Sequence, residues 1–174
     1  SKSFPGVKIL DDINIELRRG SVHAIVGENG AGKSTFMNIV FGVYQDYEGS
    51  LLWEGKEVRF ESPLDAQRCG IAMVHQENSL VPYLSVMDNI YLGHYPKKGM
   101  FIDKNQLREK AISLMKELRI EAIDPDIKVV NLSVAQKQLV EIVKALSLNA
   151  KLLMLDEPTA SLTTKETKYL MDII

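Results

Sequence analysis

The sequence predicts an α/β fold in which a mostly parallel sheet is covered by helices on both faces. Three short apolar runs, at positions 22–26, 71–74 and 152–155, have the length and composition of buried strands. Segments with apolar residues at helical spacing separate these runs, which favours parallel pairing over simple hairpins. Each run ends at a polar or glycine-rich motif. Because ligands bind beyond the carboxyl ends of strands in such sheets, the three motifs are expected to converge.

The composition is that of a globular protein of one domain with a substantial core. The chain has 174 residues, of which 45% are hydrophobic and 25% charged, and its net charge is -2. This charge gives no electrostatic case for a nucleic-acid partner. Cys69 is the single cysteine, which excludes an internal disulfide and a cysteine metal cluster. No apolar run is long enough to span a membrane, so cytosolic residence is the simplest interpretation. Both ends look cut, and we expect a piece of a longer polypeptide.

The first third of the chain predicts strands, turns and one short helix. Loose alternation over 7–17 indicates a strand with a turn at Asp11-Asp12, and a further turn follows at 18–20. Segments 49–53 and 57–60 form a predicted hairpin that turns at 54–56. Ser62 and Pro63 are typical of a helix start, and this helix is expected to end at Arg68.

The middle of the chain reads as a helical insertion without strands. Ser85 is expected to cap a short helix, 95–99 to form a turn-rich loop, and 104–118 to form an amphipathic helix. A long helix then begins at Ser133. Thr163 and Glu166 have the spacing of a capping box at the start of the last helix.

A glycine-rich loop follows the first apolar run and precedes a helical pattern of Phe36, Ile39, Val40 and Val43. Its spacing, a glycine, four residues and then Gly-Lys-Ser, predicts a phosphate-binding loop in this context. Glycines let backbone N–H groups face phosphate oxygens, and the helix N-terminus adds a partial positive charge. The lysine suits the β and γ phosphates and the serine hydroxyl suits Mg²⁺. The predicted nucleotide-binding residues of the loop are Gly27, Glu28, Asn29, Gly30, Ala31, Gly32, Lys33, Ser34 and Thr35.

The other two apolar runs end at residues suited to phosphoryl transfer. Asp156 can hold Mg²⁺ directly or through water, and Glu157, one residue on, can polarise a water. Gln76 can ligate Mg²⁺ and contact the attacking water. Alone, Gln76 would more often be a surface residue, and an Asp-Glu pair could simply begin a loop. The preceding apolar residues and the upstream phosphate loop favour the functional interpretation.

The start of the long helix has two compatible interpretations. Ser133 and Gln136 have the spacing of a capping box, which is a structural feature. A capped helix start still presents N–H groups and a positive dipole end, so it can also serve as a second anion site.

These motifs, in this order, resemble ATP-binding-cassette ATPases over nearly the whole chain. Val134–Leu146 and Asp156–Thr163 are similar to the first cassette of the ATP-binding subunits of bacterial monosaccharide importers. The resemblance implies a P-loop NTPase (RecA-like) core with an antiparallel β subdomain and an inserted helical subdomain, incomplete at its C-terminal end. The core would comprise residues 1–80 and 136–174, and the helical signature subdomain residues 81–135.

The resemblance also implies roles for individual residues. Phe4, just upstream of the first predicted strand, would stack on adenine. Lys33, Gln76 and Glu157 would act in catalysis, with Glu157 as general base. The Mg²⁺ ligands would be Ser34, Gln76 and Asp156. The signature residues that would reach the γ-phosphate on a partner cassette are Leu132, Ser133, Val134, Ala135 and Gln136. Ser161 and Leu162 would lie across the seam between the cassettes.

The implied cofactors are ATP and Mg²⁺, and the implied partners belong to a transporter. They are a second cassette, in the same full-length chain or a second copy, the membrane-spanning permease subunits and, indirectly, an extracytoplasmic sugar-binding protein. The location would be the cytoplasmic face of the bacterial membrane. The helical insertion would contact the permease subunits.

Two departures from the family pattern are visible. Val134 and Ala135 replace two signature glycines, and their Cβ atoms restrict how close a phosphate can approach. The family's γ-phosphate histidine would lie beyond Ile174, and the strand leading to it would lie between strands 22–26 and 152–155.

Other functions remain open. A regulatory half-cassette would bind ATP with little hydrolysis, and an importer could carry nucleosides or another small solute. A DNA-repair cassette is disfavoured because the stretch from Ser34 to Ser133 lacks sustained heptads and carries one cysteine.

Overall fold

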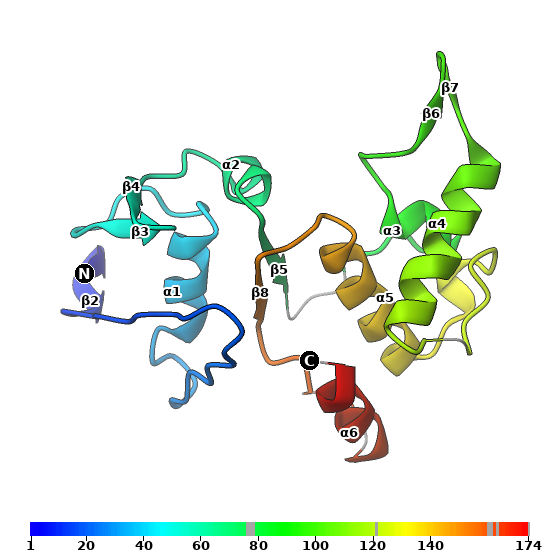
Figure 1. Ribbon diagram of the computed structural model, residues 1–174. Helices are drawn as coiled ribbons and strands as arrows, with labels where there is room; N and C mark the ends of the chain where they lie inside the picture. The colour runs from blue at the N-terminus through cyan, green and yellow to red at the C-terminus, as the bar shows by residue number, and fades with distance from the viewer. Residues whose placement is uncertain (76–78, 121, 160–161, 163, 174) are drawn as a thin grey trace. The chain divides into compact units, whose positions relative to one another are not determined.

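The chain alternates short strands with helices (Figure 1) and divides into two units, residues 1–71 and 72–174, which are described separately. The structure is a computed structural model, and it describes residues 1–75, 79–120, 122–159, 162 and 164–173. Within these ranges the strands form four two-stranded sheets. No helix in these ranges combines the length and the apolar character needed to cross a membrane.

The first unit begins with a hairpin that the sequence did not predict. Strand β1 (Lys2–Phe4) pairs antiparallel with β2 (Val7–Leu10), and Gly6 between them has a φ of 82°. This left-handed conformation suits glycine and lets the chain reverse within two residues. Phe4 therefore lies in a strand rather than upstream of the first one. The predicted strand over 7–17 ends at Leu10, before the Asp11-Asp12 turn.

The predicted strand over 22–26 is not formed, and this is the largest error of the sequence analysis. The segment has no strand pairing in the described part of the chain, and Val22 and Val26 are 78% and 92% exposed. A strand needs a neighbour that satisfies its N–H and C=O groups, and none of the described strands lies in register beside this segment. An apolar run alone therefore does not make a strand.

Helix α1 (Lys33–Val40) follows the glycine-rich loop, with Met37 and Val40 buried. The sequence pattern extended to Val43, but the helix ends earlier. The N–H of Val43 donates to Asn38 O at 2.8 Å, and Gly42, with a φ of 78°, donates to Ile39 O at 3.1 Å. These two bonds close the helix through a left-handed glycine.

The rest of the first unit matches its predictions closely. Strands β3 (Leu51–Trp53) and β4 (Lys56–Val58) form the expected antiparallel hairpin. Its turn residues Glu54 and Gly55 have φ values of 49° and 79°. Helix α2 (Pro63–Arg68) begins as predicted, because the Ser62 hydroxyl accepts a hydrogen bond from Asp65 N–H at 3.3 Å.

The two apolar runs of the second unit are strands with the predicted bounds. Strand β5 (Ile71–Val74) pairs with β8 (Leu152–Leu155) in one sheet. Just beyond the strands, Asp156 N–H donates to Val74 O at 3.0 Å. The pairing thus brings together chain segments that are about eighty residues apart in sequence, and it fixes Asp156 beside the end of β5.

A helical cluster occupies the middle of the second unit. Helices α3 (Val86–Ile90) and α4 (Lys104–Glu117) begin at the side-chain caps Ser85 and Asp103, and a 3₁₀ turn spans Val129–Asn131. The cluster's core residues include Ile90, Leu107, Ala111 and Met115. The prediction of a strand-free insertion was wrong, because β6 (Lys97–Lys98) and β7 (Phe101–Ile102) form a small hairpin. Strands of two residues are too short to leave a periodic signal.

Helix α5 (Val134–Leu146) contributes to two separate cores. Val140 and Val143 pack in the helical cluster, whereas Ile142 and Ala145 pack with Ala72 and Val74 of β5. Figure 1 shows α5 between α4 and the β5–β8 pair.

Helix α6 (Thr164–Ile173) contributes Leu170 to the core that contains Ala72 and Val74 of β5. The capping box predicted from Thr163 lies outside the described residues. The division into residues 1–80, 136–174 and 81–135 remains a prediction.

Candidate nucleotide-binding site

The glycine-rich loop curls through two left-handed glycines. Gly30 and Gly32 have φ values of 85° and 94°, and Ala31 N–H donates to Glu28 O at 3.1 Å. A Cβ on Gly32 would lie 2.7 Å from Leu10 Cδ2 and 3.2 Å from Ile9 O. Glycine is therefore required at position 32 both by the backbone conformation and by the close approach of β2.

The N-terminus of α1 has no side-chain cap. Gly32 occupies the cap position, it makes no side-chain hydrogen bond, and the first turn of the described helix holds no acidic residue. The first N–H groups of an α-helix have no acceptor within the helix, and they carry the positive end of its dipole. This helix start therefore suits an anion.

Lys33 closes the loop from within. Its Nζ donates to Gly27 O at 2.8 Å and to Glu28 O at 3.0 Å. These bonds hold the ammonium over the turn, beside the helix start. Ser34, next along the chain, is exposed. Together, a lysine ammonium, an uncapped helix start and a hydroxyl fit a nucleotide phosphate with its magnesium ion.

The ring of Phe4 already has two neighbours. It contacts Tyr44 edge-to-face, with ring centroids 5.4 Å apart and an interplanar angle of 79°. Lys2 Nζ lies 4.7 Å from the Phe4 centroid. Phe4 is half-buried, and its predicted stacking on adenine remains a prediction.

The acidic pair lies at the end of β8, as the sequence predicted. Asp156 is buried, whereas Glu157 is exposed and has a φ of 48°. A left-handed glutamate costs backbone energy, and such residues often occur at functional sites. Gln76 lies outside the described residues. The phosphate loop and the acidic pair belong to different units, so their convergence remains a prediction.

The start of α5 carries the capping box that the sequence predicted. Gln136 N–H donates to Ser133 Oγ at 3.2 Å, and Ser133 N–H donates to Gln136 Oε1 at 2.9 Å. Val134 is exposed and Ala135 is buried, so the two residues that replace glycines face different surroundings. Ser161 lies outside the described residues, and Leu162 packs partly buried beside the β5–β8 core.

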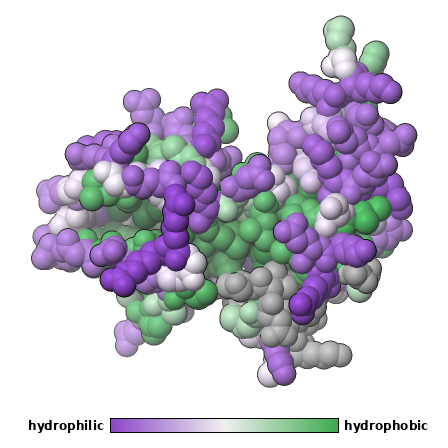
Figure 2. Space-filling view, in the orientation of Figure 1, coloured by the Kyte–Doolittle hydropathy of each residue, from purple (hydrophilic) through white to green (hydrophobic). Residues whose placement is uncertain are grey.

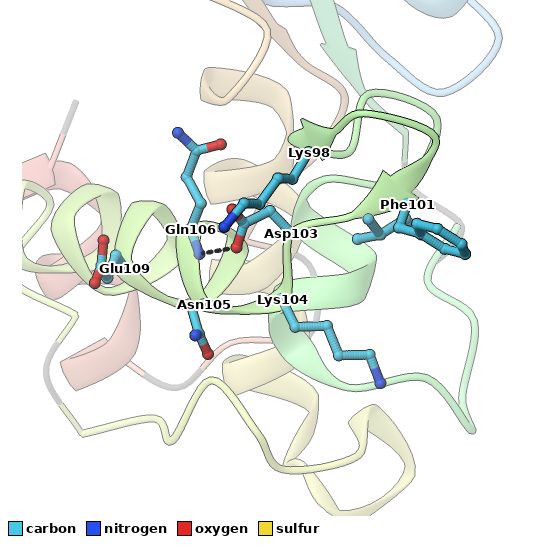
Figure 3. Close-up of a pocket in the computed structure, with 8 residues that line it drawn as sticks. Lys98, Phe101, Asp103, Lys104, Asn105, Gln106 and Glu109 are labelled. Carbon is cyan, nitrogen blue, oxygen red and sulfur yellow. Dashed lines mark hydrogen bonds between the residues drawn. The ribbon is translucent and has the colours of Figure 1, made fainter.

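A surface hollow of about 740 Å³ lies beside the β6–β7 hairpin and contains none of the predicted site residues. Figure 3 shows the Gln106 N–H bond to Asp103 that caps α4 within this hollow, with Lys98 and Phe101 around it. At the hairpin tip Met100 and Phe101 are 97% and 80% exposed, and Figure 2 shows the tip as pale green surface above hydrophilic purple. The sequence analysis missed this feature, for which a Gly99 turn was the available signal.

Comparison with known proteins identifies relatives along the whole chain. Residues 10–160 match the ABC transporter family. The chain is 52% identical over 174 residues to the galactose/methyl galactoside import ATP-binding protein MglA of Escherichia coli. It is also 52% identical to a putative ribose/galactose/methyl galactoside import ATP-binding protein of Agrobacterium fabrum. All of this chain is covered in both matches, but it spans 34% of the length of each relative.

Solved structures with the same fold are ATP-binding cassettes. One, the MJ1267 cassette of an ABC transporter, has a TM-score of 0.86 and 28% identity, covering 99% of this chain and 72% of that one. Another, a dimeric MJ0796 cassette bound to ADP and phosphate, has a TM-score of 0.78 and 25% identity, covering 95% of this chain and 72% of that one. The glycine-rich loop, the strand-end acidic pair and these matches lead to one conclusion: the chain belongs to the ABC transporter family and has the P-loop NTPase fold of its cassettes.

Proposed function

We propose that this chain is the first ATP-binding cassette of an importer subunit, which hydrolyses ATP with Mg²⁺ and couples cassette closure to monosaccharide uptake. The observation that carries the proposal is the loop at residues 27–35, where Lys33 bridges two loop carbonyls in front of an uncapped helix start. The 52% identity to a galactose import protein supports a monosaccharide as the transported solute.

The side chains divide the chemistry among them. Lys33 and the loop N–H groups bind the β and γ phosphates, and binding replaces the bonds that Lys33 makes to Gly27 O and Glu28 O. Ser34, Gln76 and Asp156 hold Mg²⁺, which when bound neutralises phosphate charge. Glu157 orients the attacking water and accepts its proton. Phe4 stacks on the adenine.

The signature residues act in trans on a second cassette. Ser133 and the start of α5 contact the γ-phosphate that the partner cassette holds, so two cassettes close over two nucleotides. A dimeric relative of the same fold supports this arrangement. Closure acts on membrane-spanning permease subunits at the cytoplasmic face, and an extracytoplasmic sugar-binding protein delivers the solute.

A second candidate function is a regulatory cassette that binds ATP but hydrolyses it slowly. The Cβ atoms of Val134 and Ala135 favour it, because they limit the approach of a phosphate to the start of α5. An importer of nucleosides is a further alternative, and uptake of labelled galactose, ribose and a nucleoside by the reconstituted transporter separates these solutes.

Single-turnover hydrolysis by the full-length protein tests the catalytic proposal. Glu157→Gln is expected to bind ATP normally, to lower the hydrolysis rate at least about a hundredfold and to accumulate an ATP-bound dimer. Glu117→Gln, an exposed glutamate on α4, serves as the matched control and keeps the wild-type rate. Equal, slow hydrolysis by wild type and Glu157→Gln, with tight ATP binding, favours the regulatory cassette.

A further inference from the structure

Lys2 is a buried lysine at the start of β1 that no role proposed above uses. It is 3% exposed, whereas the side chain of its ion-pair partner, Asp46, is 85% exposed. Burial costs a lysine both hydration and rotamer freedom, and a methionine could fill a similar space without carrying a charge. Packing alone is therefore a weak reason for a lysine at this position, and the contacts of its ammonium group show what it holds.

The ammonium group of Lys2 is fixed by one residue of the segment that follows α1. Lys2 Nζ donates to Asp46 Oδ1 at 2.5 Å and to Asp46 O at 2.8 Å. The backbone supports the same junction, because Glu48 N–H donates to Ser1 O at 2.9 Å. Hydrogen bonds between charged groups are stronger than neutral ones, so Asp46 gives this ammonium a defined position.

The same ammonium group lies over the ring of Phe4. Lys2 Nζ is 4.7 Å from the Phe4 centroid and 5.5 Å from the Tyr44 centroid, and the two centroids are 5.4 Å apart. These distances form a nearly equilateral triangle, so Tyr44 does not lie across the Phe4 ring from Lys2. A cation within about 6 Å of a ring centroid is attracted to the ring face. Lys2 therefore covers one face of Phe4, and neither Lys2 nor Tyr44 covers the opposite face.

The hairpin that carries Phe4 is attached near both ends of α1, within the first unit of the chain. At the helix start Gly32 packs closely against β2, where an added Cβ would lie 2.7 Å from Leu10 Cδ2. Beyond the helix end, Asp46 holds Lys2. Because α1 begins at the phosphate loop, these two attachments set where the Phe4 ring lies relative to that loop.

We propose that Lys2 is a positioning residue for adenine recognition, which holds the Phe4 ring at one face and leaves the opposite face to the base. This inference rests on the proposed function for the stacking of Phe4 on adenine. The contact between Lys2 and Phe4 does not depend on that function. A ring that is held in place before ATP arrives loses less freedom on binding, so Lys2 contributes to the affinity for the base and not for the phosphates.

The first test is a double-mutant cycle on the thermal unfolding of this cassette in the ligand-free, full-length protein. Because Lys2 and Phe4 are in contact, the Tm shift of the double variant Lys2→Met/Phe4→Leu should differ from the sum of the two single shifts. Lys8→Met is the matched control, since Lys8 pairs with Asp11 on the surface of the same hairpin. Its shift should add to that of Phe4→Leu. Additive shifts for Lys2 and Phe4 would overturn the contact.

The second test measures the affinity of the full-length protein for ATP and for inorganic tripolyphosphate by calorimetry. Phe4→Leu should weaken ATP binding about tenfold and Lys2→Met about fivefold, and both should bind tripolyphosphate like wild type. Asp46→Asn changes an exposed side chain and keeps the backbone acceptor of Lys2, so it folds where a Lys2 variant fails. It should show a smaller loss, for ATP only. Lys8→Met should bind both ligands like wild type.

The outcomes separate the positioning role from the proposed function. If Lys2→Met bound both ATP and tripolyphosphate more weakly, the effect would be a general one on the fold, and the positioning role would be overturned. Wild-type ATP affinity in Lys2→Met, beside a loss in Phe4→Leu, would overturn it as well. Unchanged ATP affinity in Phe4→Leu would instead overturn the stacking of Phe4 in the proposed function, while the double-mutant cycle would still report the contact.

Discussion

The starts of α1 and α5 are both predicted to meet phosphate, yet they are built differently. At α1 a glycine occupies the cap position and makes no side-chain bond, and Lys33 folds over the loop. At α5 Ser133 and Gln136 satisfy each other's N–H groups in a reciprocal box. At the start of α1 no side chain accepts from the first N–H groups, which suits a ligand, whereas at the start of α5 the Ser133 side chain accepts from one of them. On the proposed function, a phosphate would supply the missing cap at α1, whereas at α5 it would meet only the N–H groups that the capping box leaves to other acceptors.

Among substitutions at the two helix starts, we expect the largest effect on stability at Gly32. Gly32→Ala should lower the free energy of unfolding by about 2–3 kcal/mol, because alanine is strained at this positive φ and its Cβ would collide with β2. Urea denaturation of the ligand-free protein measures the loss. Gly30→Ala is the matched control, since Gly30 has a similar φ of 85° but nothing within 4 Å of a Cβ. Equal losses at the two glycines would show that packing against β2 contributes nothing.

Lys33→Ala should weaken ATP binding by at least about tenfold, or 1.4 kcal/mol, because the phosphates lose their charged contact. Equilibrium titration with a labelled nucleotide measures the change. Lys137→Ala removes a lysine from the first turns of α5, and it should leave the ATP affinity of a single cassette unchanged. If both variants bound ATP like wild type, the start of α1 would not be the phosphate-binding site of the cassette.

Ser133→Ala should cost about 1 kcal/mol of stability, because the capping box is lost. Ser34→Ala is the counterpart at α1, where no side chain caps the helix, and it should leave the thermal stability of the ligand-free protein within about 0.5 kcal/mol. For ATP binding by a single cassette, Ser34→Ala should be the more damaging of the two variants, since it should reduce the gain in affinity that Mg²⁺ provides. A stability loss at Ser34 that matched the loss at Ser133 would argue against the difference between the two starts.

The smallest effect concerns pH at the far end of α5. His94 Nε2 lies 3.1 Å from Oγ of Ser147, the C-cap of α5, and burial, with a contribution from the charge of Lys110, lowers the pKa of His94 below its ordinary value of 6.5. The unfolded chain then binds the proton more readily, so stability should fall as pH drops below 6.5. His94→Gln should flatten this dependence in denaturation curves between pH 7.5 and about 5. An unchanged slope in that variant would assign the dependence to other groups.

Local signals predicted the elements whose formation depends on nearby residues. Ser62 and Pro63 set the start of α2, and the capping box set the start of α5, because caps act within one turn. The runs at β5 and β8 were predicted with their bounds because their apolar residues are confined to four positions each. The glycine-rich loop was recognised from its spacing together with the apolar run before it and the helical pattern after it.

What the sequence could not predict depends on distant partners. The apolar run at residues 22–26 predicts a strand, but a strand forms only beside a pairing partner, and the sequence of the segment does not specify that partner. Glu141 reads as an ordinary polar position of a helix, because its partner Ser79 is 62 residues away. The left-handed φ of Glu157 was equally invisible, since glutamate carries no signal for that conformation.

The unpaired segment at 22–26 has a practical consequence for handling this polypeptide. Val22, Ile25 and Val26 expose apolar side chains next to backbone groups that no described strand pairs with, and the side chains of Ile13, Ile15 and Leu17 are exposed as well. Exposed apolar surface and unpaired backbone favour self-association, which increases with protein concentration. Light scattering across a dilution series should therefore reveal reversible clusters, and mild detergent should disperse them.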